Sequence, residues 1–202
     1  MKFQEPAPCI HIYSDVFDAS EFISLLEQEC AQEWGYLSWF QTTVGGPGRN
    51  MVAPEYRSSL GCELAPLYVE PENVTNDRVL PLIAQWRNMS SALENCIWNY
   101  RNTFNVDLSG NEGYRVLKYG VGAEYRGHID HAPDNGRILS MVAFLNDVPN
   151  GGELTFPIMG VQVKPQAGTV VLFPSNFPYY HFAASVGEND NTVKYSLVTW
   201  FR

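Results

Sequence analysis

The residues with the clearest chemical potential are a histidine and an aspartate two positions apart, His128 and Asp130, and a distant second histidine, His181. Residues i and i+2 of a β-strand point to the same face, so this imidazole and carboxylate could bind one ion. His181 follows a short apolar run and a proline-rich bend, and it is the best candidate for a third ligand. Two histidines and one carboxylate with open coordination positions are the ligand set of non-haem Fe(II) oxygenases. A His-x-Asp pair taken alone would instead be interpreted as a surface turn.

The other two histidines are weaker candidates for a metal site. His131 directly follows Asp130, so strand alternation would point it away from the ligand face. His11 lies in an apolar N-terminal run and is interpreted as an ordinary packed or surface histidine.

A lysine interrupts the apolar stretch 193–200 near the end of the chain. If this stretch is a strand that lines the core, Lys194 needs an anionic partner, because an isolated buried ammonium group is very costly. A bound dicarboxylate would supply that partner. Alternatively, Lys194 lies on the solvent face of an edge strand, where lysine is frequent. The position in the sequence leaves both interpretations open.

The elements that must position these residues change in kind along the chain. Residues 18–34 have a four-residue apolar spacing and a capping box at Asp18 and Glu21, and residues 77–104 keep a helical period as one helix or two. Short apolar runs separated by Gly, Pro and Asn then predict strands in a sandwich or barrel, at 114–119, 138–145, 152–156, 161–164, 169–173 and 193–201. We expect an α+β, mainly β fold in one domain over 1–202, with mostly helical support in 1–110 and the β core in 111–202.

Composition excludes several classes of protein. The 202 residues carry a formal charge of −9 and are 45% hydrophobic, which excludes a disordered chain and argues against nucleic-acid or polybasic membrane partners. The four cysteines have no zinc-ligand spacing, and the sequence shows neither a signal-peptide pattern nor an 18-residue apolar run. We therefore expect a cytoplasmic protein with reduced cysteines.

A glycine-rich segment at residues 43–50 cannot be the interior of a helix or strand. Its glycines are Gly45, Gly46 and Gly48. Two interpretations are equally supported: an ordinary surface loop, or a lid that closes over a site.

Taken together, these residues resemble the 2-oxoglutarate/Fe(II)-dependent dioxygenases, specifically their prolyl 4-hydroxylase-like branch. The order and approximate spacing of His128, Asp130, His181 and Lys194 agree with that family. The flanking segments that agree are 114–119, 124–125, 137–139, 144–148, 151–157, 163–165, Gly168 and 172–175. The similarity is dense from about residue 112 to 202, and thinner in 12–17 and 57–59. An acidic insertion at 187–191 makes the loop before Lys194 longer than usual.

The resemblance implies a double-stranded β-helix (jelly-roll) core with N-terminal supporting helices. It implies Fe(II) bound by His128, Asp130 and His181, and 2-oxoglutarate bound by Lys194 and Tyr119. The cosubstrate would also need a hydroxyl beside the lysine, for which Ser140 is a guess. O2 is the second cosubstrate, and ascorbate is the expected reductant.

The activity implied is hydroxylation of a C–H bond with decarboxylation of 2-oxoglutarate to succinate. Related halogenases replace the metal-binding carboxylate with a small residue, so Asp130 favours hydroxylation. Prolyl 4-hydroxylation of a peptide or protein is the leading hypothesis, and a free amino acid or another small molecule is the alternative. Candidate substrate-binding residues are Arg57, Tyr125, Arg126, Arg137, Tyr180 and Trp200, with the 43–55 loop as a lid; for each single aromatic, core packing is the competing interpretation.

Two further hypotheses are disfavoured. Related nucleic-acid demethylases carry paired arginines after the distal histidine, whereas this chain has only Lys194 and Arg202. A jelly-roll binding module without catalysis should have lost at least one of the four site residues.

Overall fold

The computed structural model describes residues 2–45, 51–187 and 192–202. Its helices are α1 (Ser20–Cys30) and α2 (Leu80–Phe104), with short 3-10 turns at Ala65–Leu67, Pro71–Asn73 and Asp77–Val79. Its strands are β1 (Lys2–Ala7), β2 (Ile10–Ser14), β3 (Phe40–Gln41), β4 (Leu60–Glu63), β5 (Arg115–Tyr119), β6 (Tyr125–His128), β7 (Leu139–Phe144), β8 (Leu154–Phe156), β9 (Val161–Val163), β10 (Thr169–Pro174), β11 (His181–Ala183) and β12 (Lys194–Phe201).

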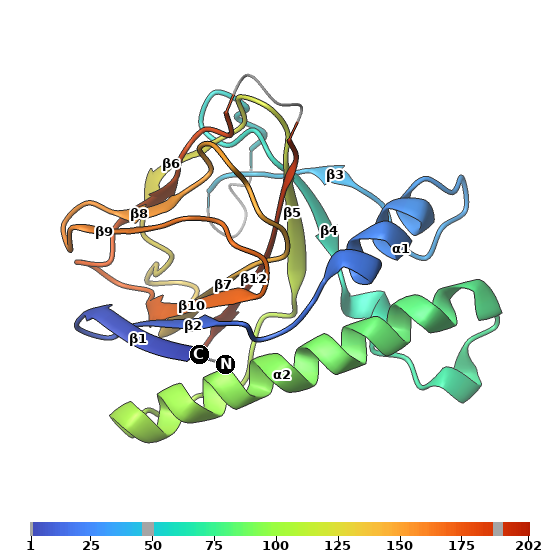
Figure 1. Cartoon of the computed structure of the whole chain (residues 1–202), viewed down its shortest axis with the longest axis horizontal. Helices are drawn as coiled ribbons and strands as arrows, with labels where there is room; N and C mark the ends of the chain where they lie inside the picture. The colour runs from blue at the N-terminus through green and yellow to red at the C-terminus, as the bar shows by residue number, and fades with distance from the viewer. Residues whose placement is uncertain (1, 46–50, 188–191) are drawn as a thin grey trace.

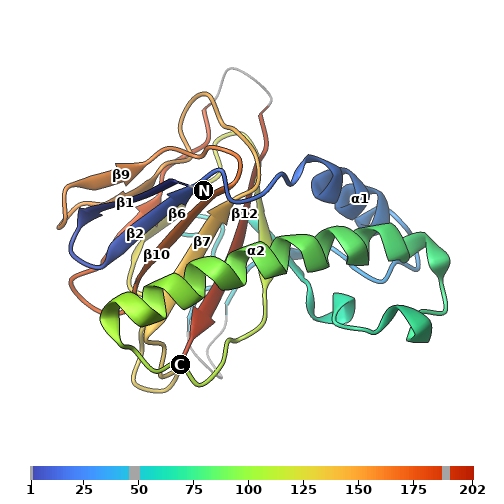
Figure 2. The same ribbon diagram turned by 60° about the horizontal axis from the view of Figure 1, so that its bottom comes forward.

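The strands form two antiparallel sheets that make up a jelly-roll core. The major sheet has eight strands in the order β1-β2-β10-β7-β12-β5-β4-β3, and the minor sheet has the order β6-β11-β8-β9. Helices α1 and α2 lie on one side of the major sheet, and the minor sheet lies on the other side (Figures 1 and 2). This mainly β architecture with supporting helices confirms the predicted fold class.

The two faces of the major sheet serve two different cores. On β10, Val170 and Leu172 pack with the helices, whereas Val171 and Phe173 pack with residues of the minor sheet. The alternation follows from the two-residue period of a strand, and it explains why β10 is apolar throughout. The same alternation divides β12, so Lys194 and Tyr195 face opposite sides.

The helices agree with the sequence pattern in type but not always in their ends. Helix α2 is one continuous helix that begins at Leu80, three residues later than predicted and after the 3-10 turn Asp77–Val79, and it ends at Phe104, before Asn105, whose φ is +48°. Helix α1 begins after Ala19 and ends at Cys30, four residues earlier than predicted. No capping box forms: the N-cap is Ala19, which makes no side-chain cap hydrogen bond, and Asp18 Oδ1 accepts from the N–H of Ser20, the first residue of the helix. Trp34, counted in the helical period, is exposed.

Strands from the first part of the chain complete the major sheet, which differs from the expected division at residue 110. β1 and β2 add to it beside β10, and β3 and β4 add to it beside β5. β2 is apolar because it is buried on both faces, and β1 is almost entirely exposed, so neither shows the alternation that identifies a strand. None of the described helices is long and apolar enough to cross a membrane. All four cysteines are free thiols.

Candidate metal centre and its pocket

Two short strands of the minor sheet bring the predicted metal ligands together. His128 is the last residue of β6, His181 is the first residue of β11, and the two are paired across the sheet. Asp130 lies just beyond the end of β6, where its backbone N–H donates to the Ser175 carbonyl at 3.1 Å. The simple i, i+2 strand argument therefore gave the correct side for Asp130, but the loop contact to Ser175 holds it there.

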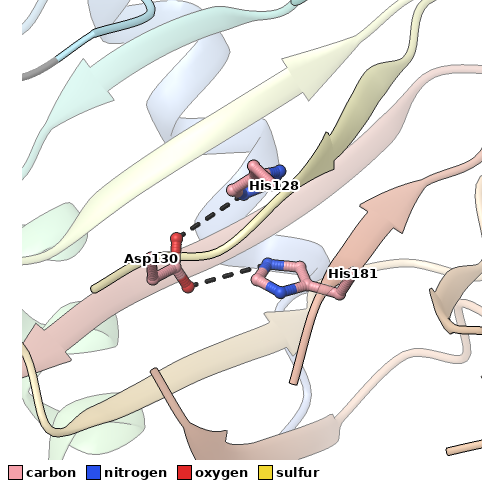
Figure 3. A group of neighbouring side chains, drawn as sticks. All are labelled: His128, Asp130 and His181. Atoms are coloured by element: carbon pink, nitrogen blue, oxygen red, sulfur yellow. Dashed lines mark ion pairs between the residues drawn. The ribbon is translucent and has the colours of Figure 1, made fainter. Parts of the chain in front are cut away.

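The three side chains point toward one another (Figure 3). His128 Nε2 lies 3.5 Å from Asp130 Oδ1, and His181 Nε2 lies 3.6 Å from Asp130 Oδ2. These separations are longer than a typical N–H···O hydrogen bond. One ligand atom from each residue lies within 4.8 Å of the others. The donor atoms thus surround a shared space.

Backbone carbonyls fix the orientation of both imidazoles. His128 Nδ1 lies 2.8 Å from the Arg126 carbonyl, and His181 Nδ1 lies 3.0 Å from the Tyr179 carbonyl. A carbonyl only accepts, so each Nδ1 carries the proton and each Nε2 presents its lone pair to the shared space. This is the arrangement that orients metal-binding histidines.

The protonation states also suit a cation. Burial lowers the pKa of His181 to about 4, so this imidazole is neutral at pH 7. Burial alone would raise the pKa of Asp130, but His181, His128 and the Ser140 hydroxyl outweigh it and hold the pKa below its usual value. A neutral imidazole and an ionised carboxylate are the forms that bind metal.

Ser140 supports the carboxylate rather than the cosubstrate. Its hydroxyl donates to Asp130 Oδ2 at 2.7 Å and lies 2.8 Å from Ser175 Oγ. The guess that Ser140 assists Lys194 is therefore wrong, because its hydroxyl is already engaged at the metal centre. Ser140 thus belongs to the site, but as a support of Asp130 and not as a partner of Lys194.

A partly enclosed pocket extends from the metal centre between the two sheets. Its walls are mainly apolar side chains from β5, β7, β8 and β12, so charged groups inside it have little access to water. The polar and aromatic residues that line it are Arg57, Tyr119, Tyr125, His128, Asp130, His181, Lys194, Ser196 and Trp200.

Lys194 lies inside this pocket, on a central strand. Its side chain is 2% exposed, and burial lowers its pKa to about 7. Nζ donates to the Gly152 carbonyl at 2.6 Å and lies 4.7 Å from the centre of the Tyr119 ring. A Cβ at Gly152 would lie 3.0 Å from Lys194 Cδ, so the glycine leaves room for the lysine. The edge-strand interpretation is thus excluded. Among the described residues no carboxylate forms an ion pair with the ammonium group, although Glu153 acts on it at longer range and partly offsets the effect of burial on its pKa.

The pocket hydroxyl on the same strand as Lys194 belongs to Ser196, which was not among the predicted site residues. Ser196 is two residues farther along β12 and so shares its face. Its side chain is buried, lines the pocket, and Oγ has no hydrogen-bond partner among the described residues. The i, i+2 spacing of Lys194 and Ser196 on a predicted strand was the signal that could have found it.

Arg57 is a second buried cation in the pocket. Its side chain is 5% exposed, and its guanidinium carbon lies 4.4 Å from the centre of the Tyr125 ring. Its guanidinium donates to the Thr43 carbonyl and lies 3.4 Å from the Ser59 hydroxyl. The structure gives it no ion pair with any described carboxylate. Tyr125 in turn stacks on His128, with ring centres 3.8 Å apart.

The remaining candidate substrate residues separate into different environments. Trp200 lines the pocket, but Arg137 lies 3.8 Å over its ring and is ion-paired with Glu112, so Arg137 is already engaged by other side chains. Arg126 is exposed and pairs with Glu124. Tyr180 lies outside the metal pocket, on a neighbouring hollow.

The glycine-rich loop is described only at its ends. Gly45 has a φ of +111°, which favours glycine, while Gly46 and Gly48 lie outside the described residues. An antiparallel bridge joins Val44 to Met51, with both backbone hydrogen bonds near 3 Å. The base of the loop is therefore held together, and the lid hypothesis stays a prediction.

The donor set fits Fe(II), and the pocket fits a dicarboxylate. Two imidazole nitrogens and one carboxylate on one side of an ion leave positions open for other ligands. The ammonium group of Lys194, which has no ion pair among the described residues, and the hydroxyl of Ser196, which has no hydrogen-bond partner among them, line the same pocket from one face of β12. One molecule carrying two carboxylates could satisfy both places.

Comparisons with known proteins point to one superfamily. The family model of the 2OG-Fe(II) oxygenase superfamily matches residues 114–202. Human prolyl 4-hydroxylase subunit alpha-1 is 33% identical over 102 residues, which cover 45% of this chain and 18% of that protein. The chain thus spans less than a fifth of the length of this relative.

Solved prolyl hydroxylases share the fold over nearly the whole chain. A Pseudomonas putida prolyl-4-hydroxylase has a TM-score of 0.64 at 21% identity, covering 96% of this chain and 92% of that one. A Trichoplax adhaerens prolyl hydroxylase, solved with a hypoxia inducible factor oxygen degradation domain peptide fragment, has a TM-score of 0.65 at 18% identity, covering 96% and 83%. Residues 114–202 therefore match the 2OG-Fe(II) oxygenase family model, and the chain is similar to prolyl 4-hydroxylases in sequence over 102 residues and in fold over nearly its whole length.

Proposed function

We propose that this chain is an Fe(II)- and 2-oxoglutarate-dependent dioxygenase that hydroxylates a C–H bond, with a prolyl residue of a peptide or protein as its substrate. The observation that carries the proposal is that the metal-ligand triad and a buried lysine, which forms no ion pair among the described residues, line one pocket. The matches to prolyl 4-hydroxylases support the choice of substrate.

Different residues along the pocket bind the metal ion and the cosubstrate. His128, Asp130 and His181 would hold Fe(II), which with 2-oxoglutarate and O2 would supply the oxidising chemistry that converts the cosubstrate to succinate and CO2. Lys194 binds the distal carboxylate, and Ser196 Oγ donates a hydrogen bond to it. Tyr119 closes the pocket beside the ammonium group. The apolar walls exclude water and strengthen these charged interactions.

Hydroxylation of a free amino acid is a second candidate, favoured by one observation. Arg57 is buried in the pocket with only a carbonyl and a hydroxyl as described partners, and such a guanidinium suits a substrate carboxylate in bidentate contact. In a peptide substrate, Arg57 would instead donate to backbone carbonyl groups.

The test begins with enzyme loaded anaerobically with Fe(II), ascorbate and 2-oxoglutarate. O2 is then admitted, and succinate is measured together with the mass of the substrate. We expect a gain of 16 Da on proline-containing peptides and no gain on free amino acids. Ascorbate is included as the proposed reductant, and its omission should lower the number of turnovers. If neither coupled nor uncoupled succinate production appears, and Asp130→Ala behaves as the wild type, the proposed function is wrong.

A further inference from the structure

A second hollow adjoins the metal pocket on the outer side of β6 and β11. It is an open surface hollow of about 430 Å³, and Tyr56, Tyr180 and Phe182 form much of its lining. Tyr125 lines both this hollow and the metal pocket. Because its ring also stacks on His128, Tyr125 is the wall between the metal centre and the hollow.

One glycine makes room for the aromatic lining. A Cβ at Gly127 would lie 1.7 Å from Tyr180 Oη and 2.2 Å from Cζ, so no other residue fits there without displacing the phenol. Gly127 directly precedes His128, and Tyr180 directly precedes His181. The Tyr180 phenol therefore lies against the strand that carries the first histidine, at the rim of the metal centre.

A second phenol converges on the same glycine. Tyr56 Oη donates to the Gly127 carbonyl at 2.6 Å, and its ring lies 6.1 Å from that of Tyr125 in an edge-to-face arrangement. The charges at the rim cancel each other, since Arg126 Nε lies 3.1 Å from Glu124 Oε1. The hollow thus offers aromatic surface and no unpaired charge among the described residues, which suits a neutral, apolar guest.

We propose that this hollow binds the residue next to the hydroxylated one in an extended peptide, and that Tyr180, accommodated by Gly127, determines this preference. Aromatic side chains are a suitable surface for proline-like rings and for the backbone of an extended chain. A free amino acid held at the metal centre would leave the hollow unfilled. This inference rests on the proposed prolyl hydroxylase function and specifies the substrate as a chain longer than one residue.

The experiment compares two substrates in the full chain loaded with Fe(II). One is a proline blocked at both ends as N-acetylproline methylamide, and the other is a five-residue peptide with a central proline and apolar neighbours. The measured quantity is the ratio of kcat/KM for the peptide to that for the blocked proline. A second readout is the Kd of the peptide, measured by calorimetry with Fe(II) and 2-oxoglutarate under anaerobic conditions.

We expect Tyr180→Ala to lower the kcat/KM ratio and to weaken peptide binding, each about tenfold. Tyr180→Phe keeps the ring and should keep most of the preference. Trp98→Ala is the matched control, because Trp98 is an exposed aromatic on α2 and should leave both readouts unchanged. Gly127→Ala should act like Tyr180→Ala. In the double variant Gly127→Ala/Tyr180→Ala, the methyl group at residue 127 occupies space that the phenol has left. The effects of the two substitutions on the kcat/KM ratio and the Kd should therefore not add.

Failure of this inference is distinguishable from failure of the proposed function. If the wild type hydroxylates the peptide but Tyr180→Ala changes neither the ratio nor the Kd, the subsite is overturned and the prolyl hydroxylase function stands. If the wild type makes succinate but hydroxylates neither proline substrate, the prolyl function is overturned and the subsite with it. Full additivity of Gly127→Ala and Tyr180→Ala would contradict the role assigned to Gly127.

Discussion

The two faces of the major sheet treat charged and polar groups in opposite ways. On the helix-covered face, Lys118 Nζ lies 2.8 and 2.9 Å from the two oxygens of Glu27, which also accepts a hydrogen bond from Tyr195. On the pocket face, the neighbouring strand carries Lys194, which contacts one carbonyl, and Ser196, whose hydroxyl has no partner among the described residues. Residues 194 and 195 are adjacent in sequence, so the contrast depends only on the face.

This difference shows where the protein keeps binding capacity for a ligand. The desolvation cost of a buried cation is offset only if an anion and well-aligned hydrogen bonds compensate it. The helix face supplies that anion from the chain itself, as Glu27. Among the described residues the pocket face gives Lys194 no ion pair, because Asp130 is engaged by the two histidines and Ser140, and Glu153 acts on Lys194 only from a longer distance. The polar groups of the pocket, Lys194 and Ser196, are therefore available to bind a ligand.

The largest expected effect concerns this carboxylate. Asp130→Ala removes a metal ligand, so turnover should fall by more than the about 10–100-fold typical of residues that only support ligands. Fe(II) binding, followed by metal analysis after desalting, should be lost in parallel. Retention of both metal and succinate production by Asp130→Ala would show that the triad is not the metal site.

The next effect compares the two lysines directly. Lys194→Met should weaken 2-oxoglutarate binding about 10–100-fold, because a hydrogen-bonded charge contact is lost. The same change should leave the ligand-free protein as stable or more stable, because it removes a buried cation that lacks an anion. Calorimetry and denaturant unfolding measure the two quantities.

Lys118→Met is the matched control on the other face. It leaves Glu27 without its cation, so the free energy of unfolding should fall by about 0.5–1 kcal/mol, the range of a partly exposed ion pair. Binding of 2-oxoglutarate should stay within about twofold of the wild type. If both lysines affected stability and cosubstrate binding alike, the distinction between the faces would be lost.

The titration of Lys194 gives a pH-dependent form of the same comparison. Its pKa is about 7 in the ligand-free fold, against about 10.4 in an unfolded chain, so the unfolded chain binds more protons between these values. The contribution of Lys194 to stability therefore rises with pH across this interval and is least below pH 7. The unfolding free energy of the wild type should therefore increase between pH 7 and pH 9 by more than that of Lys194→Met, which lacks this contribution.

Cosubstrate binding should reverse the shift in this pKa. A bound carboxylate favours the charged ammonium group, so 2-oxoglutarate binding at pH 8 should be accompanied by proton uptake. Calorimetry in buffers of different ionisation enthalpy measures it. Equal proton uptake in the wild type and Lys194→Met would assign the proton to another group.

The sequence predicted the site better than the strands that build it. Residue type and spacing made His128, Asp130 and His181 candidates for a metal site, and the resemblance to 2-oxoglutarate/Fe(II)-dependent dioxygenases implied the role of Lys194, which its position in the sequence had left open. β6 and β11, which carry the histidines, were missed as strands because they are four and three residues long and contain little apolar periodicity. Their pairing is a tertiary interaction that no local pattern encodes.

The roles of the arginines were harder to predict for the same reason. Arg57 and Arg137 were both expected to contact substrate, yet Arg137 is neutralised by Glu112, which lies 25 positions earlier in the chain. Only the three-dimensional pairing distinguishes a cation that is already engaged from one that lines the pocket. The register of β12 similarly selects Ser196 over Ser140.

The smallest expected effect compares two hydroxyls of β12 on opposite faces. Ser196→Ala removes the orphan hydroxyl from the pocket, so 2-oxoglutarate binding should weaken about fivefold, the equivalent of about 1 kcal/mol for one hydrogen bond. Stability of the ligand-free protein should not fall, since no hydrogen bond is lost.

Thr199 is the control on the helix face, where its hydroxyl donates to the Gly113 carbonyl at 2.7 Å. Thr199→Val should lower the unfolding free energy by about 1–3 kcal/mol, because it leaves that carbonyl without its partner, while 2-oxoglutarate affinity stays within twofold. If Ser196→Ala lowers stability but leaves cosubstrate affinity unchanged, the Ser196 hydroxyl has a structural role like that of Thr199. The two faces of β12 would then not differ in how they use their hydroxyls.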